Sequence, residues 1–384
     1  MSDLLALLMS YETLRVIWWL FLGVLLIGFA VMDGFDLGIG ALLPVIARTD
    51  DERRVLINTI GPTWEGNQVW FVLGGGAIFA AFPLIYAAAF SGFFVALILV
   101  LFALILRPVG FDYRSKLPDP RWRSTWDWCL FVGGFVPALV FGVAFGNLLQ
   151  GVPLRFDAEM RVFYDGNFFG LLNPFALVCG VVSLAMLAMH GAVFLQLKTV
   201  GELHARARRW QGIAALVYAS AFAVAGLWLV LGIDGYRLVS FAGSEGASNP
   251  LAKTAVREAG AWLANYRAAP LLWLIPALGF AGAALAWRLG PRRPGWAFVA
   301  SAVSVGATIL TAAVAMFPFM LPSSIAPSHS LTVWDSTSSL LTLRWMFCMT
   351  VLFLPLIILY TSWVFRVMRG PVTLDDVRGS DAHY

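Results

Sequence analysis

The sequence predicts an all-α polytopic membrane protein with about nine transmembrane helices, because each crossing takes about 20 apolar residues. Of its 384 residues, 60% are hydrophobic and only 12% are charged, and the mean hydropathy is +0.80. Soluble domains contain roughly 25% charged residues, so this composition excludes a soluble globular protein. Continuous apolar runs such as 87–106 and 298–321 exclude a transmembrane β-barrel, whose strands alternate apolar and polar residues. We expect a single integral membrane domain over residues 1–384.

Hydropathy separates the chain into apolar segments of about 20 residues, the length that crosses the hydrocarbon layer. The expected spans are 16–36, 62–82, 85–106, 126–148, 168–195, 212–231, 268–287, 296–321 and 343–364. The second and third spans meet at Phe82 and Pro83 with almost no loop, so a count of eight is the alternative. Residues 1–15 lack a cationic segment and a small-residue cleavage site, which predicts a short exposed end and not a signal peptide.

Two other segments carry local predictions. Small residues four apart, Gly34 with Gly38 and Gly142 with Gly146, allow helices to approach closely. The longest outer loop is 234–267, and its segment 251–266, LAKTAVREAGAWLANY, has apolar residues at helical spacing. A short surface or interfacial helix is expected there.

Loop charges set the expected orientation, since Lys and Arg near span ends tend to remain on the cytoplasmic side. Seventeen of the 26 Lys and Arg residues lie in alternate loops and the C-terminal tail, and eight lie in the other loops. The N-terminus is therefore expected outside and the C-terminus inside. This distribution also explains the net charge of +4 without a nucleic-acid partner.

A few ionisable residues lie within or beside the spans, where charges are costly and indicate function. Asp33 and Asp36 approach the inner end of the first span and share a helix face. Glu65 begins the second span on the same side, and Arg107 ends the third. We expect these four residues to converge. A buried carboxylate beside an arginine can take up and release a proton near neutral pH. The alternative is that Asp36 and Glu65 cap helices or pair with Arg107 to fix helix register.

Ligands for a redox centre are sparse in this sequence. Haem iron usually takes a His or Met ligand, and the four histidines are His190, His204, His329 and His383. His190 lies within the fifth span, where a hydrogen-bonded core residue is the main expectation. The three cysteines show no CxxC spacing, and HExxH and CxxCH motifs do not occur. We therefore expect no haem, metal site or catalytic residue in this chain.

Most of the 16 tryptophans lie near predicted span ends, as residues of an interfacial belt do. Trp70 is deeper, beside the glycines at 74–76. It is a candidate for lining an apolar cavity that admits a small ligand, with packing as the alternative.

Long segments of the chain follow one another in a recognisable order: LLIGFAVMDGFDLGIGALLP, PTWEGNQVWFVLGGGAIFAAFP, LRPVGFDYRSK, GVAFGNLLQGVP, KTVGELHAR and LTVWDSTSSLLTLRWM. Together they resemble subunit II of the bacterial cytochrome bd ubiquinol oxidases. The resemblance covers nearly the whole chain, and only residues 1–10 and the extreme tail diverge. It implies a fold of two four-helix bundles plus one further helix.

The resemblance also implies a function. Such a complex oxidises quinol, reduces dioxygen to water and builds a proton gradient in aerobic respiration. Haem b and haem d are then carried by the larger subunit I, which this chain binds as a heterodimer partner and supports. The implied location is the bacterial cytoplasmic (inner) membrane, with the N-terminus periplasmic and the C-terminus cytoplasmic. Small single-helix accessory subunits and membrane lipid are further partners that the resemblance allows.

Particular residues acquire roles through this resemblance. Asp36, Glu65 and Arg107 fall on motif positions associated with proton access to haem d, and Asp33 is adjacent. Glu65 stands where relatives carry Asp, which preserves the carboxylate and changes its reach. A ubiquinone-type quinone in a structural position and an oxygen route are also implied, and Trp70 is the candidate residue for either.

Two other functional classes compete with this interpretation. A secondary transporter would couple protons through carboxylates, but such proteins show inverted repeats and broken helices near mid-membrane. Here the charges lie at one edge and no repeat is visible. The third class is a purely structural membrane anchor.

Overall fold

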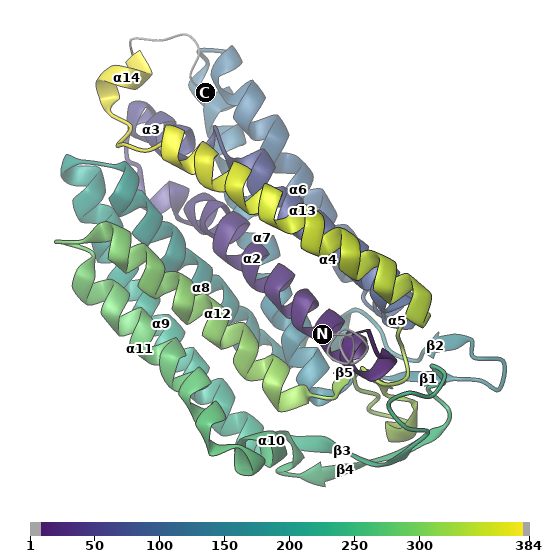
Figure 1. Cartoon of the computed structure of the whole chain (residues 1–384). Helices are drawn as coiled ribbons and strands as arrows, with labels where there is room; N and C mark the ends of the chain where they lie inside the picture. Colours follow the sequence, from purple (N-terminus) through teal and green to yellow (C-terminus); the bar gives the residue numbers. More distant parts are fainter. Residues whose placement is uncertain (1–8, 379–384) are drawn as a thin grey trace.

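The computed structural model describes residues 9–378, which form a bundle of long helices with short strands at one end (Figure 1). The long helices are α2 (Tyr11–Ile46), α4 (Trp64–Ala81), α6 (Phe94–Tyr113), α7 (Pro120–Gln150), α8 (Pro174–Lys198), α9 (Gly201–Gly232), α11 (Leu274–Leu289), α12 (Pro294–Met316) and α13 (Leu340–Val367). The shorter helices are α3 (Asp50–Ile60), α5 (Pro83–Gly92), α10 (Ala264–Ala268) and α14 (Leu374–Arg378).

Local chemistry explains where several helices begin. Ser10, Asn173 and Ser339 directly precede α2, α8 and α13, and each side chain accepts a backbone N–H of the first turn. Thr49 and Glu52 form a reciprocal capping box on α3. The exposed end expected over residues 1–15 is wrong from Tyr11 onward, because α2 begins there. Residues 1–8 lie outside the described part of the chain.

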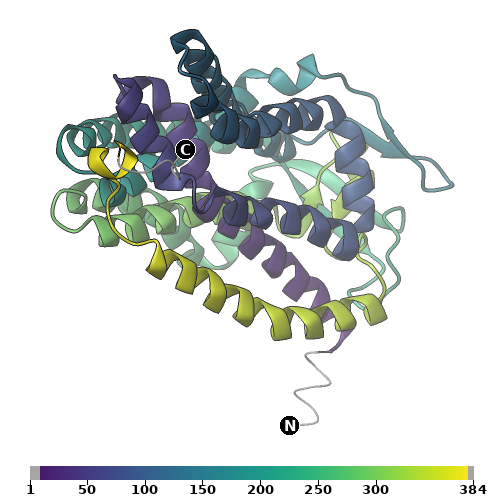
Figure 2. The ribbon, with the colours of Figure 1, turned by 90° about the horizontal axis from the view of Figure 1, so that it is seen from above.

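Two four-helix bundles plus one further helix build the membrane part, which confirms the predicted fold class. The first bundle contains α2, α4, α6 and α7, and the second contains α8, α9, α11 and α12. Helices α2 and α7 pack on α8 and join the bundles, while α13 lies against α2 and α4. Figure 2 shows α13 along one side of the molecule.

Glycines bring backbones together where the bundles meet. A Cβ on Gly38 of α2 would lie 2.0 Å from a carbonyl oxygen of α8, and one on Gly142 of α7 would lie 2.2 Å from another. Gly34 and Gly146 make further close contacts with α8. The packing role predicted for these two glycine pairs is therefore confirmed.

Eight helices of the described chain are long and apolar enough to cross a membrane. Helix α4 packs along α2 and brings the number of crossings to about nine, although Glu65, Asn67 and Gln68 make its first turns polar. The third expected span, 85–106, began too early, because α5 ends at Gly92 and the crossing is α6. The eighth, 296–321, ended too late, because the cap Phe317 and Pro318 terminate α12.

The end of the molecule opposite α3, here called the hairpin end, carries three antiparallel two-stranded sheets. Their strands are β1 (Leu154–Phe156) with β2 (Val162–Tyr164), β3 (Asp234–Phe241) with β4 (Lys253–Ala259), and β5 (Phe319–Leu321) with β6 (Leu331–Thr332). The helix expected over 251–266 is wrong over β4, and helical turns occur only from Ala261 onward. A segment this short is compatible with both the helical and the strand period of apolar residues, and pairing with β3 satisfies its backbone groups.

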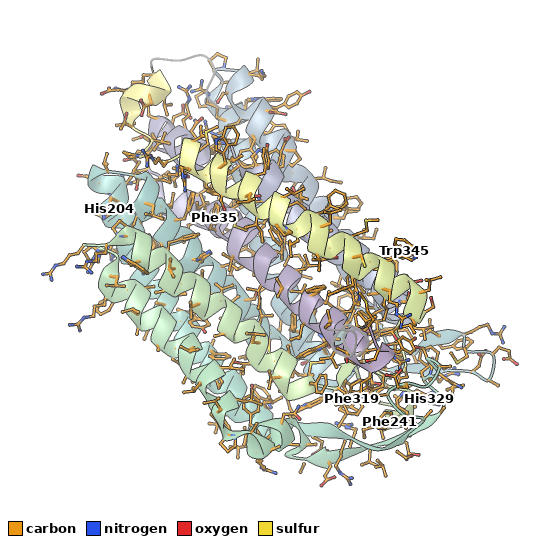
Figure 3. The ribbon with its side chains drawn as sticks, in the orientation of Figure 1. Phe35, His204, Phe241, Phe319, His329 and Trp345 are labelled. Carbon is orange, nitrogen blue, oxygen red and sulfur yellow. The ribbon has the colours of Figure 1, made fainter. Side chains whose placement is uncertain are left out.

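The opposite end, here called the basic end, contains α3, α14 and the turn between α11 and α12 (Figure 1). Figure 3 places His204 at the basic end and His329 at the hairpin end. The tail folds back over the basic end, where Val372 N–H donates to the Lys198 carbonyl and Arg378 pairs with Asp51.

Candidate functional site

Two carboxylates and an arginine meet inside the first bundle toward the basic end. Arg107 Nη1 and Nη2 donate to the two oxygens of Asp33 at 3.0 and 2.7 Å, and Nη2 lies 3.9 Å from Asp36 Oδ2. The exposed fractions are 0% for Asp33, 1% for Asp36 and 2% for Arg107. Three of the four residues expected to converge are therefore together. One guanidinium faces two carboxylates in a dry environment, where such pairs are strong and an extra charge is costly.

Helix geometry and a glycine on α7 make this arrangement possible. Asp33 and Asp36 are three residues apart on α2 and so lie on one helix face. The stem of Arg107 on α6 passes close to α7, where a Cβ on Gly133 would lie 2.7 Å from Arg107 Cγ. Glycine at position 133 therefore leaves the space that the arginine side chain occupies.

Asp36 has a partner on α4 that sequence reasoning missed. Asn67 Nδ2 donates a 2.8 Å hydrogen bond to Asp36 Oδ2, and both side chains are buried. Asp36 Oδ1 has no hydrogen-bond donor among the described residues. Asp36 also borders a cavity of about 10 Å³, close to the space one water needs, which Ile57 and Ile60 of α3 line as well. Asn67 is uncharged, so neither the charge pattern nor the hydropathy of the sequence singled it out.

Glu65 does not join this group in the chain as it stands. It lies in the first turn of α4, but its side chain is exposed, whereas Asn67 faces Asp36. Residues two apart on a helix point in nearly opposite directions, about 200° around the axis. The sequence placed Glu65 at the correct depth and could not fix the rotation of α4.

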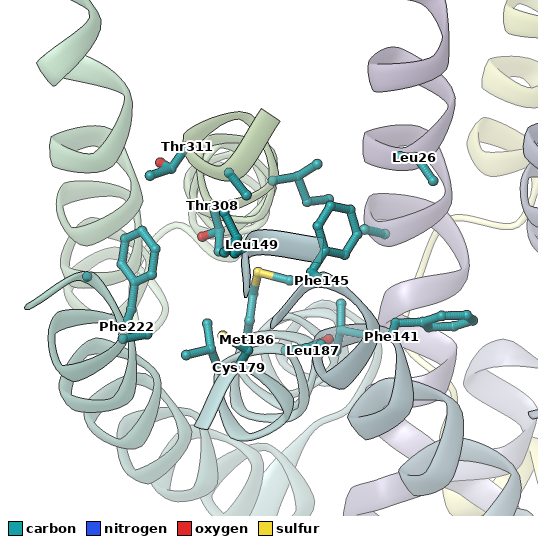
Figure 4. Close-up of a pocket in the computed structure, with 18 of the residues that line it drawn as sticks. Leu26, Phe141, Phe145, Leu149, Cys179, Met186, Leu187, Phe222, Thr308 and Thr311 are labelled. Carbon is teal, nitrogen blue, oxygen red and sulfur yellow. The ribbon is translucent and has the colours of Figure 1, made fainter. Parts of the chain in front are cut away.

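A large apolar cavity of about 200 Å³ lies between the bundles (Figure 4). Leu26 of α2, Met186 of α8, Phe222 of α9 and Thr308 of α12 are among its lining residues. Trp70 does not line it. The Trp70 ring instead packs on α2, where a Cβ on Gly28 would lie 2.6 Å away, and the neighbouring Phe71 borders the cavity.

The histidines of the described chain are engaged in hydrogen bonds. His190 is fully buried, with Nε2 2.9 Å from the Val31 carbonyl oxygen and Nδ1 2.7 Å from Ser301 Oγ. A carbonyl only accepts, so Nε2 donates, and Nδ1 is occupied by the Ser301 hydroxyl. No group of three or more His, Cys, Asp or Glu that could hold a metal occurs within residues 9–378. Both ring nitrogens of His190 are engaged in these contacts, and no histidine of the described part lines the apolar cavity.

A second charged network lies at the basic end and was not singled out from the sequence. Arg114 is buried and donates to Asp127 at 2.5 and 3.2 Å and to Asp50 at 2.8 Å. Arg53 also pairs with Asp127, and Arg123 with Asp50. Topology alone accounts for cations at this end, so the sequence offered no reason to pair them. Nearby, donation from Arg206 lowers the pKa of the Glu52 carboxyl.

The hairpin end is fixed by buried polar contacts. Arg15 is fully buried and donates to the carbonyls of Ser244 and Gly246 at 2.5 and 2.8 Å. Lys253 Nζ lies 2.9 Å from Asp335 Oδ2, and burial lowers the pKa of Lys253. These contacts tie the start of α2 and strand β4 to loops far along the chain.

The fold and the buried charge group define a polytopic helical membrane protein with a charged site inside its first bundle. The chain belongs to the cytochrome bd terminal oxidase subunit II family, whose family model matches residues 14–368. Cytochrome bd-I ubiquinol oxidase subunit 2 of Escherichia coli K12 is 55% identical over 371 residues, covering 96% of this chain and 98% of the relative. Cytochrome bd ubiquinol oxidase subunit 2 of Bacillus subtilis is 32% identical, covering 94% and 97%.

A solved structure supports the fold independently. The bd oxidase from Geobacillus thermodenitrificans contains a chain that matches with a TM-score of 0.70 at 16% identity, covering 92% of this chain and 98% of that one. The family assignment makes this chain a subunit of a respiratory terminal oxidase, an oxidoreductase complex of bacterial membranes. It implies a partner subunit I and haem cofactors in the complex.

Proposed function

We propose that this chain and a haem-bearing subunit I form a ubiquinol:oxygen oxidoreductase of the inner membrane, in which this chain brings protons toward haem d of subunit I. The buried group of Asp33, Asp36 and Arg107 carries the proposal. Its two carboxylates and one guanidinium leave one net negative charge, and burial favours binding of a proton to cancel it. The haems, when bound in the complex, supply the electron transfer to oxygen.

The proposed proton route begins at the basic end. A cavity of about 360 Å³ there is lined by Thr63, Lys198 and residues of the tail that folds back over α3. Thr63 lies one helical turn before Asn67, and Asn67 donates to Asp36. Water that passes from this cavity to the small cavity beside Asp36 carries the protons, while Asn67 orients the Asp36 carboxylate and Arg107 and Asp33 balance its charge.

This route requires the basic end to face the cytoplasm, with the N-terminus periplasmic and the C-terminus cytoplasmic. The seventeen Lys and Arg residues of alternate loops and the tail favour that orientation. Quinol oxidation then releases protons outside while oxygen reduction takes them from inside, which builds a gradient. Reporter fusions after Lys116 and after Ala247 are expected to show opposite sidedness, and equal sidedness would reject the orientation.

The proposed surface for subunit I includes the exposed face of α4. Glu65 is exposed near the start of that helix, and lipid is a costly environment for a carboxylate. Gly75 and Gly76 are not buried, and a Cβ at either position would meet nothing within 4 Å, which lets another helix approach closely. Glu65 then faces the interface through which protons pass.

A structural quinone is the proposed occupant of the apolar cavity between the bundles. Its volume of about 200 Å³ is below the ~300–1,000 Å³ of typical ligand sites, so it suits part of an isoprenoid chain. Oxygen, which is small and apolar, can use the same space. Small single-helix accessory subunits remain a further proposed partner.

The test is a comparison of the complex with the chain purified alone. The complex is expected to show haem bands in a reduced-minus-oxidised spectrum and to consume oxygen with ubiquinol. The isolated chain is expected to show neither. Haem bands from the isolated chain would overturn the proposed division between the subunits.

A further inference from the structure

A groove on the outer surface of the second bundle combines an apolar floor with a cationic end. It has a volume of about 460 Å³ and runs between α11 and α12. Its lining consists of Leu278, Ala281, Gly282, Leu285 and Leu289 from α11, Trp296, Val299, Ala300 and Val303 from α12, and Arg293 from the turn between them. The spacing of each set places it on one helix face.

Small residues explain why a groove forms here. A Cβ on Gly282 would lie 2.7 Å from the Ala300 carbonyl oxygen, so the two helices touch through backbone along the floor. Larger side chains rise on either side, and Leu285 and Val299 are 48% and 49% exposed. The result is an open groove with apolar walls that face the hydrocarbon layer.

The dimensions suit one leaflet of a bilayer. The stripe on α11 extends from Leu278 to Leu289, a rise of about 16 Å at 1.5 Å per residue. One leaflet contributes about half of the ~30 Å hydrocarbon thickness. An acyl chain lying in the groove would therefore end near Leu278 with its headgroup beside Arg293.

The headgroup end is positively charged without internal compensation. Arg288, Arg292 and Arg293 make no ion pair with any carboxylate in the described part of the chain. No Asp or Glu occurs from residue 274 to residue 316. Trp296 lies at the same end and is 64% exposed, as an interfacial tryptophan would be. An anionic group is the complementary partner for this end.

We propose that this groove binds an anionic phospholipid of the leaflet at the basic end, with one acyl chain between α11 and α12 and the phosphate on Arg293. The site is separate from the charge group of the first bundle and does not depend on the proton route. Bound lipid fills the groove and neutralises Arg293, and it thereby links α11 and α12 at the membrane surface.

The test uses the whole complex, purified in a neutral detergent and incubated with phosphatidylcholine vesicles that contain phosphatidylglycerol. Native mass spectrometry counts the phosphatidylglycerol retained. Arg293→Gln removes the charge, and Ala281→Phe fills the groove. Both are expected to release the retained lipid while leaving the haem spectrum unchanged.

Matched controls share the substitution but not the position. Arg209→Gln removes an exposed cation at the same end, and Ala284→Phe adds a ring to the exposed face of α11 outside the groove. Both controls are expected to retain the lipid. Equal retention in all four variants would overturn the proposal, as would a protein helix found seated in the groove of the complex.

Discussion

Asn67 on α4 donates a 2.8 Å hydrogen bond to Asp36 on α2, and both side chains are buried. The bond joins the helix that carries the charge group to the helix whose exposed face is proposed to meet the partner subunit. A displacement of α4 on assembly would therefore reach Asp36 directly. Because Asp36 lies 3.9 Å from Arg107, the same displacement would change its electrostatic environment.

Replacing Asp36 by Asn should slow ubiquinol-driven oxygen consumption of the complex by about tenfold or more, in line with loss of a proton-transfer group. The amide cannot bind and release a proton, while its size and its contact with Asn67 are kept. Asp112→Asn, an exposed carboxylate near the end of α6, is the control and should leave turnover unchanged. Equal turnover of Asp36→Asn and the wild type, with intact haem content, would reject the proposed route.

Arg107→Ala should destabilise the complex by about 3–5 kcal/mol, because it leaves two buried carboxylates without their cation. Arg155→Ala breaks an exposed pair with Asp165 and should cost at most about 1 kcal/mol. Thermal unfolding followed by loss of the haem spectrum measures both. Similar midpoints for the two variants would show that the buried group contributes little to stability.

Glu65→Gln should slow proton-coupled turnover while assembly remains intact. Its carboxylate is exposed in the chain alone, so the substitution removes no hydrogen bond or ion pair within residues 9–378. Glu65→Asp keeps a carboxylate and should retain more activity than Glu65→Gln. If turnover is unchanged in a fully assembled Glu65→Gln complex, only a structural role remains for this residue.

Two glycines of α2 should respond oppositely to alanine. A Cβ on Gly38 would lie 2.0 Å from a carbonyl oxygen of α8, so Gly38→Ala should lower stability by about 1–3 kcal/mol or more. A Cβ on Gly23 meets nothing within 4 Å, and Gly23→Ala should be neutral or stabilise by up to about 1 kcal/mol. Denaturation of the two variants side by side measures the difference, and equal effects would contradict the packing described between α2 and α8.

Acid should loosen the strands of the hairpin end through His329. Its Nδ1 accepts the Phe156 N–H at 3.0 Å, and burial, aided by Lys253 and Arg155, lowers the pKa of His329. The unfolded state then binds the proton more readily, so this stability is present above about pH 6.5 and declines as the pH falls below it. The protection factor of the Phe156 amide, which is the ratio of its intrinsic to its observed exchange rate at each pH, should fall from pH 7 to pH 5. In His329→Gln that fall should disappear, and its persistence would assign the effect to another group.

The depth of the charged residues could be predicted from sequence, but their rotation could not. Spacing along the first three spans placed Asp33, Asp36 and Arg107 at one level, and the structure brings them together. Glu65 has the same depth and faces away, because the phase of α4 depends on its packing against α2. Asn67 carries no charge, so nothing in the hydropathy pattern distinguished it.

Contacts between segments far apart in the chain also could not be predicted from local sequence patterns. The sequence of strand β4 is compatible with a helix, but its backbone groups form hydrogen bonds with strand β3, so the segment is extended. Arg114 and Asp127 form an ion pair across a loop. Membrane orientation already explained the cations of that loop, so the sequence offered no reason to expect a specific pair. In both cases the missing information was a contact partner and not a propensity.

The bidentate pair of Asp33 and Arg107 joins residues 74 positions apart in the chain. During synthesis α2 leaves the ribosome with two carboxylates long before its arginine exists, and insertion into hydrocarbon in that interval would be costly. We expect α2 to stay in a hydrated environment of the insertion machinery until α6 arrives. The order in which the ribosome delivers these helices thereby decides when the first of them can enter the lipid.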